Sequence, residues 1–177
     1  MPKIIYYVAS SIDGFMAGPN DDVSDFATGG SAVDKYFSDL QNFSTVIMGR
    51  RTYEFGYKYG LVPGQPAYPH MEHFIFSKSL SIEKLAKTVH IESISVERIN
   101  EIKKASKTDI YLCGGGEFAG WLLENGLIDQ LKLKLNPIIL GEGIRLFGKS
   151  TKKAKWKLIE TENFEDGLKI LTYDFEK

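Results

Sequence analysis

The sequence is poor in cysteine and proline and lacks long apolar runs. Cys113 is the one cysteine among 177 residues. This excludes an internal disulfide framework and a zinc site built from several cysteines, and it fits a reducing compartment. No segment approaches the roughly 20 apolar residues that cross a bilayer, and the apolar stretch 4–9 is too short for the core of a signal peptide. We therefore expect a cytoplasmic protein with no membrane partner.

An excess of charge of either sign is also missing. Lys and Arg number 22 against 23 Asp and Glu, which gives a formal net charge of −1. A protein that neutralises many phosphates of a nucleic acid needs a basic excess on one face, so nucleic acid is not an expected partner. A chain of this length buries roughly 70% of the surface that it exposes when unfolded. One domain over residues 1–177 is therefore expected.

Apolar runs and helical patterns alternate along most of the chain. Continuous β-favouring runs predict strands covered on both faces, and they lie at 4–9, 45–48, 73–76, 89–91 and 110–113. Apolar residues at helical spacing predict helices at 32–40, 96–107 and 117–125, the first with Ser31 as its N-cap. This order predicts an α/β fold with a mostly parallel sheet.

The C-terminal part is richer in strands. Residues 156–164 and 168–175, on either side of Asp166-Gly167, predict a hairpin at an antiparallel edge of the sheet. Residues 131–135 alternate between leucine and lysine, which predicts a strand with one face in water. The long loop 10–31 holds many Gly, Pro, Asp and Asn residues, and loops of this length in a compact domain are usually functional.

A run of three glycines, Gly114-Gly115-Gly116, follows an apolar strand and precedes the helix that starts near Glu117. Residues without a Cβ let the backbone come close to a ligand, and a helix N-terminus offers unpaired N–H groups to a phosphate. The run predicts a pyrophosphate site, with a tight strand-to-helix turn as the alternative. With Ala119 it also matches the dinucleotide fingerprint. No acidic residue ends the next strand at Asn136, however, so a Rossmann domain is not assigned.

Two other strand ends carry groups that suit phosphates. Gly49 ends the second strand and is followed by Arg50-Arg51-Thr52. Guanidinium groups recognise phosphate through a planar fork of donors. Ser77-Lys78 follows the third strand. Ligands of open α/β sheets bind at the carboxyl ends of strands, so the three strand ends together predict one binding site for a dinucleotide.

Five motifs occur in order along nearly the whole chain. They are Ser11-Ile12-Asp13-Gly14-Phe15-Met16-Ala17, Val46 to Glu54, Phe74-Ile75-Phe76-Ser77, the glycine run, and Asn136-Pro137-Ile138-Ile139-Leu140-Gly141-Glu142-Gly143. In this order they resemble the dihydrofolate reductase fold. More closely, they resemble the RibD C-terminal domain family, which comprises the reductase domain of bifunctional riboflavin-biosynthesis proteins and its stand-alone bacterial relatives. The resemblance implies a three-layer fold with a central sheet of about eight strands, and a homodimer.

The resemblance also implies that NADPH lies across the strand ends. The residues that would border this cofactor are Gly49, Arg50, Arg51, Thr52, Ser77, Lys78, Gly114, Gly115, Gly116 and Glu117. Arg50 or Arg51, with Ser77-Lys78, would satisfy the extra phosphate of NADPH. This gives a preference for NADPH over NADH a physical basis.

Two acids are candidate proton donors. Hydride transfer to the carbon of a C=N or C=O bond leaves negative charge on the heteroatom, so a proton source should lie nearby. We expect Asp13, in the loop after the first strand, and Asp34, in the first turn of the first helix, to face the substrate. An ordinary turn residue and an ordinary helix-start acid are their alternative interpretations. No metal is expected, because His70 and His73 have no carboxylates clustered with them.

The sequence thus predicts an NADPH-dependent reductase of a small heterocycle. The resemblance implies 5-amino-6-(5-phosphoribosylamino)uracil reductase as the nearest known activity. A true dihydrofolate reductase and a non-catalytic NADP-binding protein are the alternatives. Substrate identity depends on the loops 10–31 and 57–70, whose conformations do not follow from periodicity.

Overall fold

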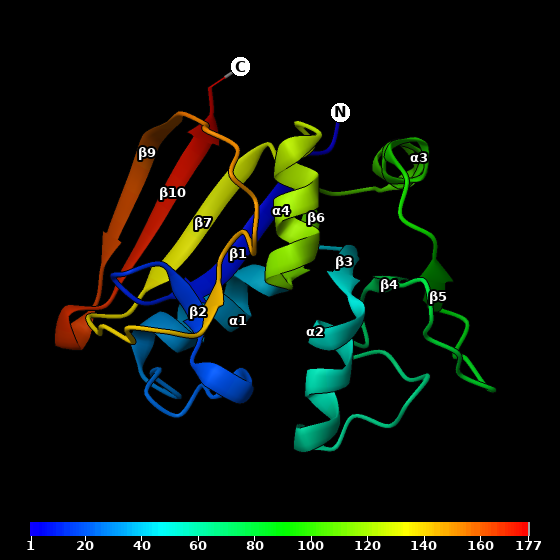
Figure 1. Ribbon diagram of the computed structural model, residues 1–177, viewed down its shortest axis with the longest axis horizontal. Coiled ribbons are helices and arrows are strands. Elements are labelled where there is room, and N and C mark those ends of the chain that lie inside the picture. The colour runs from blue at the N-terminus through cyan, green and yellow to red at the C-terminus, as the bar shows by residue number, and fades with distance from the viewer. Residues whose placement is uncertain (177) are drawn as a thin grey trace.

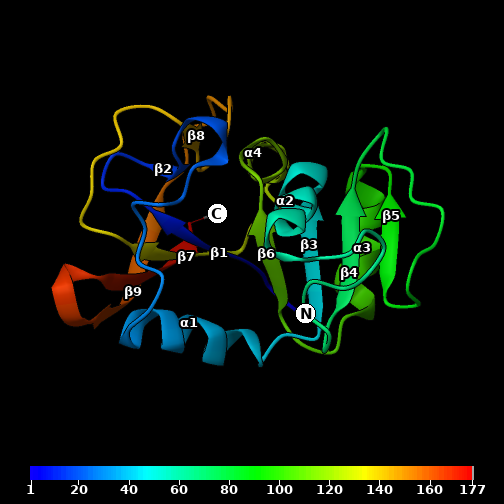
Figure 2. The ribbon, with the colours of Figure 1, turned by 90° about the horizontal axis from the view of Figure 1, so that it is seen from below.

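The computed structural model describes residues 1–176 and contains a mixed sheet with helices on both faces (Figures 1 and 2). Eight strands pair in the order β5-β4-β3-β6-β1-β7-β10-β9. Their bounds are β1 Ile4–Ser10, β3 Thr45–Gly49, β4 Glu72–Phe76, β5 Val89–Glu92, β6 Ile110–Gly114, β7 Gln130–Leu135, β9 Trp156–Asn163 and β10 Lys169–Phe175. The α-helices are α1 Ser31–Leu40, α2 Arg50–Phe55, α3 Val96–Ala105 and α4 Gly116–Glu124. Within the described residues, no helix has the length and apolar character needed to span a membrane.

The six strands from β5 to β7 run parallel, and β10 and β9 follow as an antiparallel hairpin. At the tip of the hairpin, Asp166 and Gly167 have φ values of 56° and 75°, a backbone conformation that Asp and Gly tolerate in tight turns. The predicted α/β fold, with a mostly parallel sheet and an antiparallel C-terminal hairpin, is confirmed.

Each face of the sheet carries its own apolar core. Successive side chains of a strand point to opposite faces, and in β1 Ile5 and Tyr7 pack in one core while Tyr6 and Val8 pack in the other. Helices α1 and α2 cover the first face and helices α3 and α4 cover the second. Figure 2 shows α1 and α4 on opposite sides of the strands. The layers are therefore helix, sheet and helix.

The lysine face of β7 is covered by α1, so the expectation that it lies in water is wrong. The Lys132 ammonium lies 2.7 Å from the Asp39 carboxylate and 4.9 Å from the ring centre of Tyr7. The Lys134 ammonium lies 4.9 Å from the ring centre of Tyr36, and Lys134 is only 8% exposed. Long lysine stems can lie along apolar and aromatic surface while the charge finds a partner. The alternation of leucine and lysine in 131–135 therefore did not distinguish a solvent-exposed face from a face covered by a helix.

The start of α1 also differs from the sequence prediction. The helix begins at Ser31, and the residue before it, Gly30, occupies the N-cap position with φ of 94°. Glycine adopts this conformation without the steric penalty that serine would meet. The long loop before the helix contains β2 (Phe15–Ala17), which pairs with β8 (Ile144–Arg145) in a separate two-stranded sheet. The loop is thereby attached to the segment that follows β7.

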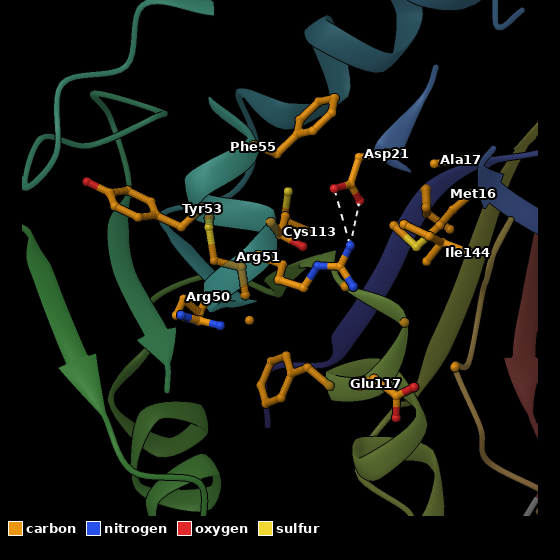
Figure 3. Close-up of a pocket in the computed structure, with 18 of the residues that line it drawn as sticks. Met16, Ala17, Asp21, Arg50, Arg51, Tyr53, Phe55, Cys113, Glu117 and Ile144 are labelled. Atoms are coloured by element: carbon orange, nitrogen blue, oxygen red, sulfur yellow. Dashed lines mark hydrogen bonds and ion pairs between the residues drawn. The ribbon is translucent and has the colours of Figure 1, made fainter. Parts of the chain in front are cut away.

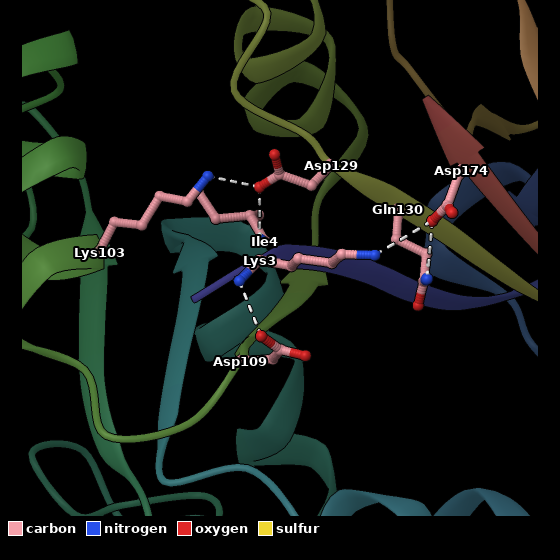
Figure 4. Close-up of polar contacts among 7 residues, drawn as sticks. All are labelled: Lys3, Ile4, Lys103, Asp109, Asp129, Gln130 and Asp174. Atoms are coloured by element: carbon pink, nitrogen blue, oxygen red, sulfur yellow. Dashed lines mark hydrogen bonds and ion pairs between the residues drawn. The ribbon is translucent and has the colours of Figure 1, made fainter. Parts of the chain in front are cut away.

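Carboxylates fasten the amino end of β1 between its two neighbouring strands (Figure 4). Asp109, just before β6, accepts a hydrogen bond of 2.7 Å from the Lys3 amide, and Asp129, just before β7, accepts one of 2.9 Å from the Ile4 amide. Asp129 also pairs with Lys103 of α3, whose side chain is almost fully buried. Hydrogen bonds to a charged acceptor are stronger than neutral ones, so this edge is fixed in register.

His73 on β4 is fully buried and held as a neutral ring. Its Nδ1 lies 3.0 Å from the Met71 carbonyl oxygen, and its Nε2 lies 3.1 Å from the Tyr68 amide nitrogen. A carbonyl oxygen only accepts and an amide N–H only donates, so Nδ1 carries the proton and Nε2 accepts. Burial lowers the pKa of His73 from 6.5 to about 4. The ring therefore supports the backbone of Tyr68 only while it is uncharged.

This environment predicts a loss of stability in acid. Between pH 6.5 and about 4 the unfolded chain takes up a proton at His73 that the folded chain does not. The stabilisation is complete above pH 6.5 and is lost as the pH falls, by about 3 kcal/mol at about 1.4 kcal/mol per pKa unit. Urea unfolding at pH 7.5 and pH 4.5 should therefore show a smaller pH dependence for His73→Gln than for the wild-type chain. Equal pH dependence in both proteins would contradict the assignment.

Candidate functional site

A cavity of about 1310 Å³ opens at the carboxyl ends of β1, β3, β4 and β6 (Figure 3). Its walls come from these strand ends, from α1, α2 and the first turn of α4, and from the loops after β1 and β8. This is the edge at which open α/β sheets bind their ligands. The elements with the predicted phosphate motifs therefore share one cavity.

Part of the wall is made of glycine backbone. Strands β3 and β6 are neighbours, and they lead into Gly49 and Gly115. A Cβ on Gly49 would lie 3.7 Å from the Gly115 nitrogen, and a Cβ on Gly115 would lie 3.0 Å from the Thr52 hydroxyl oxygen. The peptide bond between Gly114 and Gly115 is cis. The two strand ends thus form a glycine cradle, bordered by the side chains of Thr52 and Phe118, in which a ligand can approach the backbone closely.

Nine of the ten residues expected to border a cofactor line this cavity: Gly49, Arg50, Arg51, Thr52, Ser77, Lys78, Gly115, Gly116 and Glu117. Gly114 does not line it. A Cβ on Gly114 would meet Met16 and Thr52, so this glycine lies behind the wall. The structure therefore brings the three predicted strand ends together.

The two arginines differ in their partners. Arg51 donates from one guanidinium nitrogen to both carboxylate oxygens of Asp21 at 3.2 Å, across the cavity mouth (Figure 3). Arg50 makes only a 3.9 Å contact with Glu54 within the described residues, and its side chain is 45% exposed. Arg50 is therefore the guanidinium more readily available to a phosphate.

Ser77 closes the turn that follows β4. Its hydroxyl oxygen accepts hydrogen bonds from the amides of Ser79, at 3.1 Å, and Leu80, at 2.9 Å. A hydroxyl that accepts can still donate its own proton. Ser77 is thus held in place with its O–H available to an anion, next to Lys78 on the same wall of the cavity.

Neither expected proton donor lines the cavity. The Asp13 carboxylate accepts a bond from the Ser11 hydroxyl at 2.6 Å and bonds from the amides of Leu140 and Gly141 at 3.2 and 2.8 Å. These bonds, the one from Ser11 first, lower the pKa of Asp13. It therefore serves as an ionised anchor for the loop after β7. Asp34 is exposed in the first turn of α1, outside the cavity wall.

Sequence reasoning missed a group of phenolic hydroxyls on the α1 and α2 face. Tyr7, Tyr36, Tyr68 and Tyr111 line the cavity there together with Cys113. The Tyr36 and Tyr111 hydroxyls are 2.5 Å apart, and the Tyr68 hydroxyl lies 3.7 Å from the Cys113 sulfur. Burial raises the pKa of all four tyrosines and of the Cys113 thiol. The alternation of side chains along a strand could have indicated part of this group, because Tyr111 and Cys113 lie two residues apart and so on one face of β6.

Known proteins share both the sequence pattern and the fold. The family model described as RibD C-terminal domain matches residues 2–170. Protein YyaP of Bacillus subtilis (strain 168), itself uncharacterized, is 27% identical over 180 residues, which cover 97% of this chain and 94% of that protein.

Two solved structures show the same fold. One is a diaminohydroxyphosphoribosylaminopyrimidine deaminase/5-amino-6-(5-phosphoribosylamino)uracil reductase from Thermotoga maritima, with a TM-score of 0.73 and 16% identity over 99% of this chain and 57% of that one. The other is a dihydrofolate reductase from Enterococcus faecalis in complex with NADP(H), with a TM-score of 0.68 and 16% identity over 99% of this chain and 97% of that one. The chain has the fold of dihydrofolate reductases, and it belongs to the RibD C-terminal domain family.

Proposed function

We propose that this protein is an NADPH-dependent reductase that transfers a hydride to a small heterocyclic substrate. The observation that carries the proposal is the convergence of three strand ends on one cavity, with a glycine cradle between β3 and β6 and cationic side chains beside it. Membership of a family named for a reductase-bearing protein supports the same chemistry. The whole described chain would act as one reductase domain.

The residues of the cavity fit NADPH. The cradle of Gly49 and Gly115 gives the pyrophosphate access to backbone N–H groups, with the Thr52 hydroxyl beside it. Arg50 and Ser77-Lys78 are the groups that would hold the additional phosphate. When bound, NADPH supplies the hydride. The chain supplies binding, orientation and a proton.

The substrate would occupy the part of the cavity on the α1 and α2 face. A dihydrofolate reductase is the less supported alternative, because α1 places no carboxylate in the cavity. Pterin rings present a guanidine-like edge for which a carboxylate is the matching partner. A non-catalytic NADP-binding protein would not need the additional space that the cavity has on the α1 and α2 face. Catalysis is therefore the better supported alternative.

Two experiments test the proposal: a titration that measures NADPH binding, and then an assay of NADPH oxidation. Purified protein should enhance or shift the fluorescence of NADPH in a saturable titration. It should then oxidise NADPH only when a heterocyclic substrate is present, seen as loss of the nicotinamide absorbance. Absence of saturable NADPH binding would refute the proposed function.

Arg50→Ala should weaken NADPH binding by roughly 1.5–3 kcal/mol, the range for a charge-assisted hydrogen bond. NADH, which lacks the additional phosphate, should be affected less. Dissociation constants from fluorescence titration measure both effects. Arg98→Ala is the matched control, because Arg98 pairs with Glu92 and Glu101 and does not line the cavity. Equal losses for NADPH and NADH would show that Arg50 does not contact the additional phosphate.

Gly115→Ala should weaken NADPH binding because the new methyl group would fill the cradle. Its Cβ would stand 3.0 Å from the Thr52 hydroxyl oxygen, and crowding of this kind costs about 1–3 kcal/mol. Gly29→Ala is the control, since a Cβ there meets no atom within 4 Å. The same titration measures both variants. Unchanged affinity in Gly115→Ala would mean that the glycine serves the turn alone.

We also propose a homodimer formed through β9. This edge strand pairs only with β10 in the described chain, and it exposes Leu158 and Ile159 by 49% and 48%. Exposed apolar edge strands are prone to pair with another chain. Light scattering should give twice the 19.9 kDa chain mass, and Leu158→Lys should give a monomer. Val62→Lys, a substitution at an exposed loop residue, should leave the dimer intact. A monomeric wild-type protein would exclude the dimer.

A further inference from the structure

The cavity has two parts that differ in charge. Its charged lining residues come from the cavity mouth, from the starts of α2 and α4, and from the segments after β4 and around β8: Asp21, Arg50, Arg51, Lys78, Glu117, Arg145 and Lys149. By contrast, β1, β6, α1 and the loop 60–71 contribute no charged side chain to the wall. We call this second part the aromatic pocket, defined by Tyr7, Tyr36, Tyr68, Tyr111 and Cys113.

The charged residues nearest to the aromatic pocket, Asp39, Lys132 and Lys134, do not line the cavity. Lys132 is paired with Asp39 at 2.7 Å. The Lys134 ammonium faces the ring of Tyr36 at 4.9 Å, and no carboxylate lies within 4.0 Å of it in the described chain. A permanent negative charge on a ligand would therefore meet no cationic side chain directly. An oxygen that gains negative charge beside Tyr36 would instead feel the buried cation behind that ring.

The Tyr36 and Tyr111 hydroxyls share one hydrogen bond, which uses the proton of only one of them. They lie 2.5 Å apart, and the Tyr68 hydroxyl and the Cys113 thiol belong to the same cluster. Each phenol has one O–H, so if Tyr111 donates to Tyr36, the proton of Tyr36 can be donated to a ligand in the cavity or to the neighbouring Tyr68 hydroxyl. Tyr111 is almost fully buried, whereas Tyr36, on α1, is half-buried and lines the cavity. Tyr36 is thus the member of the pair placed to donate to a ligand.

We propose that Tyr36 donates a hydrogen bond and then a proton to the substrate, and that this substrate is a flat, uncharged ring with a carbonyl group. The proposal rests on the proposed reductase function. Tyr7 and Tyr68 offer aromatic surface to such a ring. Tyr111 is a positioning residue, which directs the Tyr36 proton toward the ligand. A phosphate or carboxylate on the substrate would be unpaired in the aromatic pocket.

The reaction step balances as a two-electron reduction of a carbonyl group. A hydride adds to the carbonyl carbon, and the π electrons of the C=O bond move to the oxygen. The Tyr36 O–H bond breaks and its proton neutralises that oxygen, which gives an alcohol. After the product leaves, Tyr36 regains a proton from solvent that enters the cavity, which its half-buried side chain lines. The hydride comes from the NADPH of the proposed function.

Two uncharged carbonyl rings and their anionic counterparts test the substrate class. Isatin and lumazine are the uncharged probes, and isatin-5-sulfonate and lumazine-6-carboxylate are the anionic ones. With protein saturated in NADPH, calorimetry should show each uncharged probe binding at least about 10-fold more tightly than its counterpart, since an unpaired desolvated charge costs more than 1.4 kcal/mol. If NADPH binds and neither uncharged probe has this advantage, the substrate class is wrong. If NADPH itself does not bind, the proposed function fails instead.

Tyr36→Phe tests the donor. It should weaken isatin binding roughly 3- to 10-fold, the equivalent of one hydrogen bond, and lower kcat for isatin reduction by about 100-fold, the lower range for a positioned acid. NADPH affinity should not change. Tyr111→Phe should retain more kcat than Tyr36→Phe, while Tyr173→Phe on β10, outside the cavity, should match the wild type. Wild-type binding and kcat in Tyr36→Phe, or binding of isatin without any reduction by the wild type, would overturn the donor assignment.

Discussion

The site depends on two neighbouring strands that end without side chains at the same edge of the sheet. Strands β3 and β6 lie side by side, and the backbone of Gly49 faces that of Gly115 where they end. The next glycine is more tightly constrained, because a Cβ on Gly116 would come within 2.4 Å of the Arg145 carbonyl oxygen. The segment after β8 therefore packs directly on the first turn of α4. Larger residues at these positions would both fill the cavity and push its walls apart.

The two ends of the sheet have different roles: contacts at the amino ends of the strands fix the register, and the carboxyl ends form the cavity. At the amino ends, Asp109 and Asp129 accept hydrogen bonds from the first residues of β1 and fix its register against β6 and β7. At the carboxyl ends, β3 and β6 lead almost directly into α2 and α4 through glycines, which leave backbone groups to a ligand. Loops that bind ligands need a rigid scaffold beneath them. The carboxylate contacts in Figure 4 provide it at the edge opposite the cavity.

The fold and the strand ends that line the cavity could be predicted from the sequence, because both depend on local signals. Continuous apolar runs marked the buried strands, and each glycine-containing strand end lay directly after one of them. The aromatic pocket could not be predicted in this way. Its hydroxyls come from α1, β6 and the loop 60–71, and Tyr36 meets Tyr111 only because α1 crosses beneath the sheet. The same crossing covers Lys132 and Lys134, which local alternation placed in water.

The acids expected from the sequence show the same limit. Asp13 lies next to the strand that carries Tyr7, yet its carboxylate is used by the amides of Leu140 and Gly141. The hydrogen-bond partners of a carboxylate in a loop depend on where distant loops pass, and one sequence does not contain that information. Sequence position therefore located the correct edge of the sheet without identifying the group that faces the cavity.

A neutral hydroxyl pair suits this cavity better than a carboxylic acid would. An ionised carboxylate in the aromatic pocket would lose its hydration, and no cationic side chain in the wall would compensate it. Burial acts in the opposite direction on a phenol, because it raises the pKa of Tyr36 and Tyr111 and so keeps both protonated. The donor is then protonated at neutral pH. The Lys134 ammonium, 4.9 Å from the centre of the Tyr36 ring, would stabilise negative charge that the proposed reaction creates beside that ring. The aromatic pocket can thus be uncharged at rest and still favour a charged transition state.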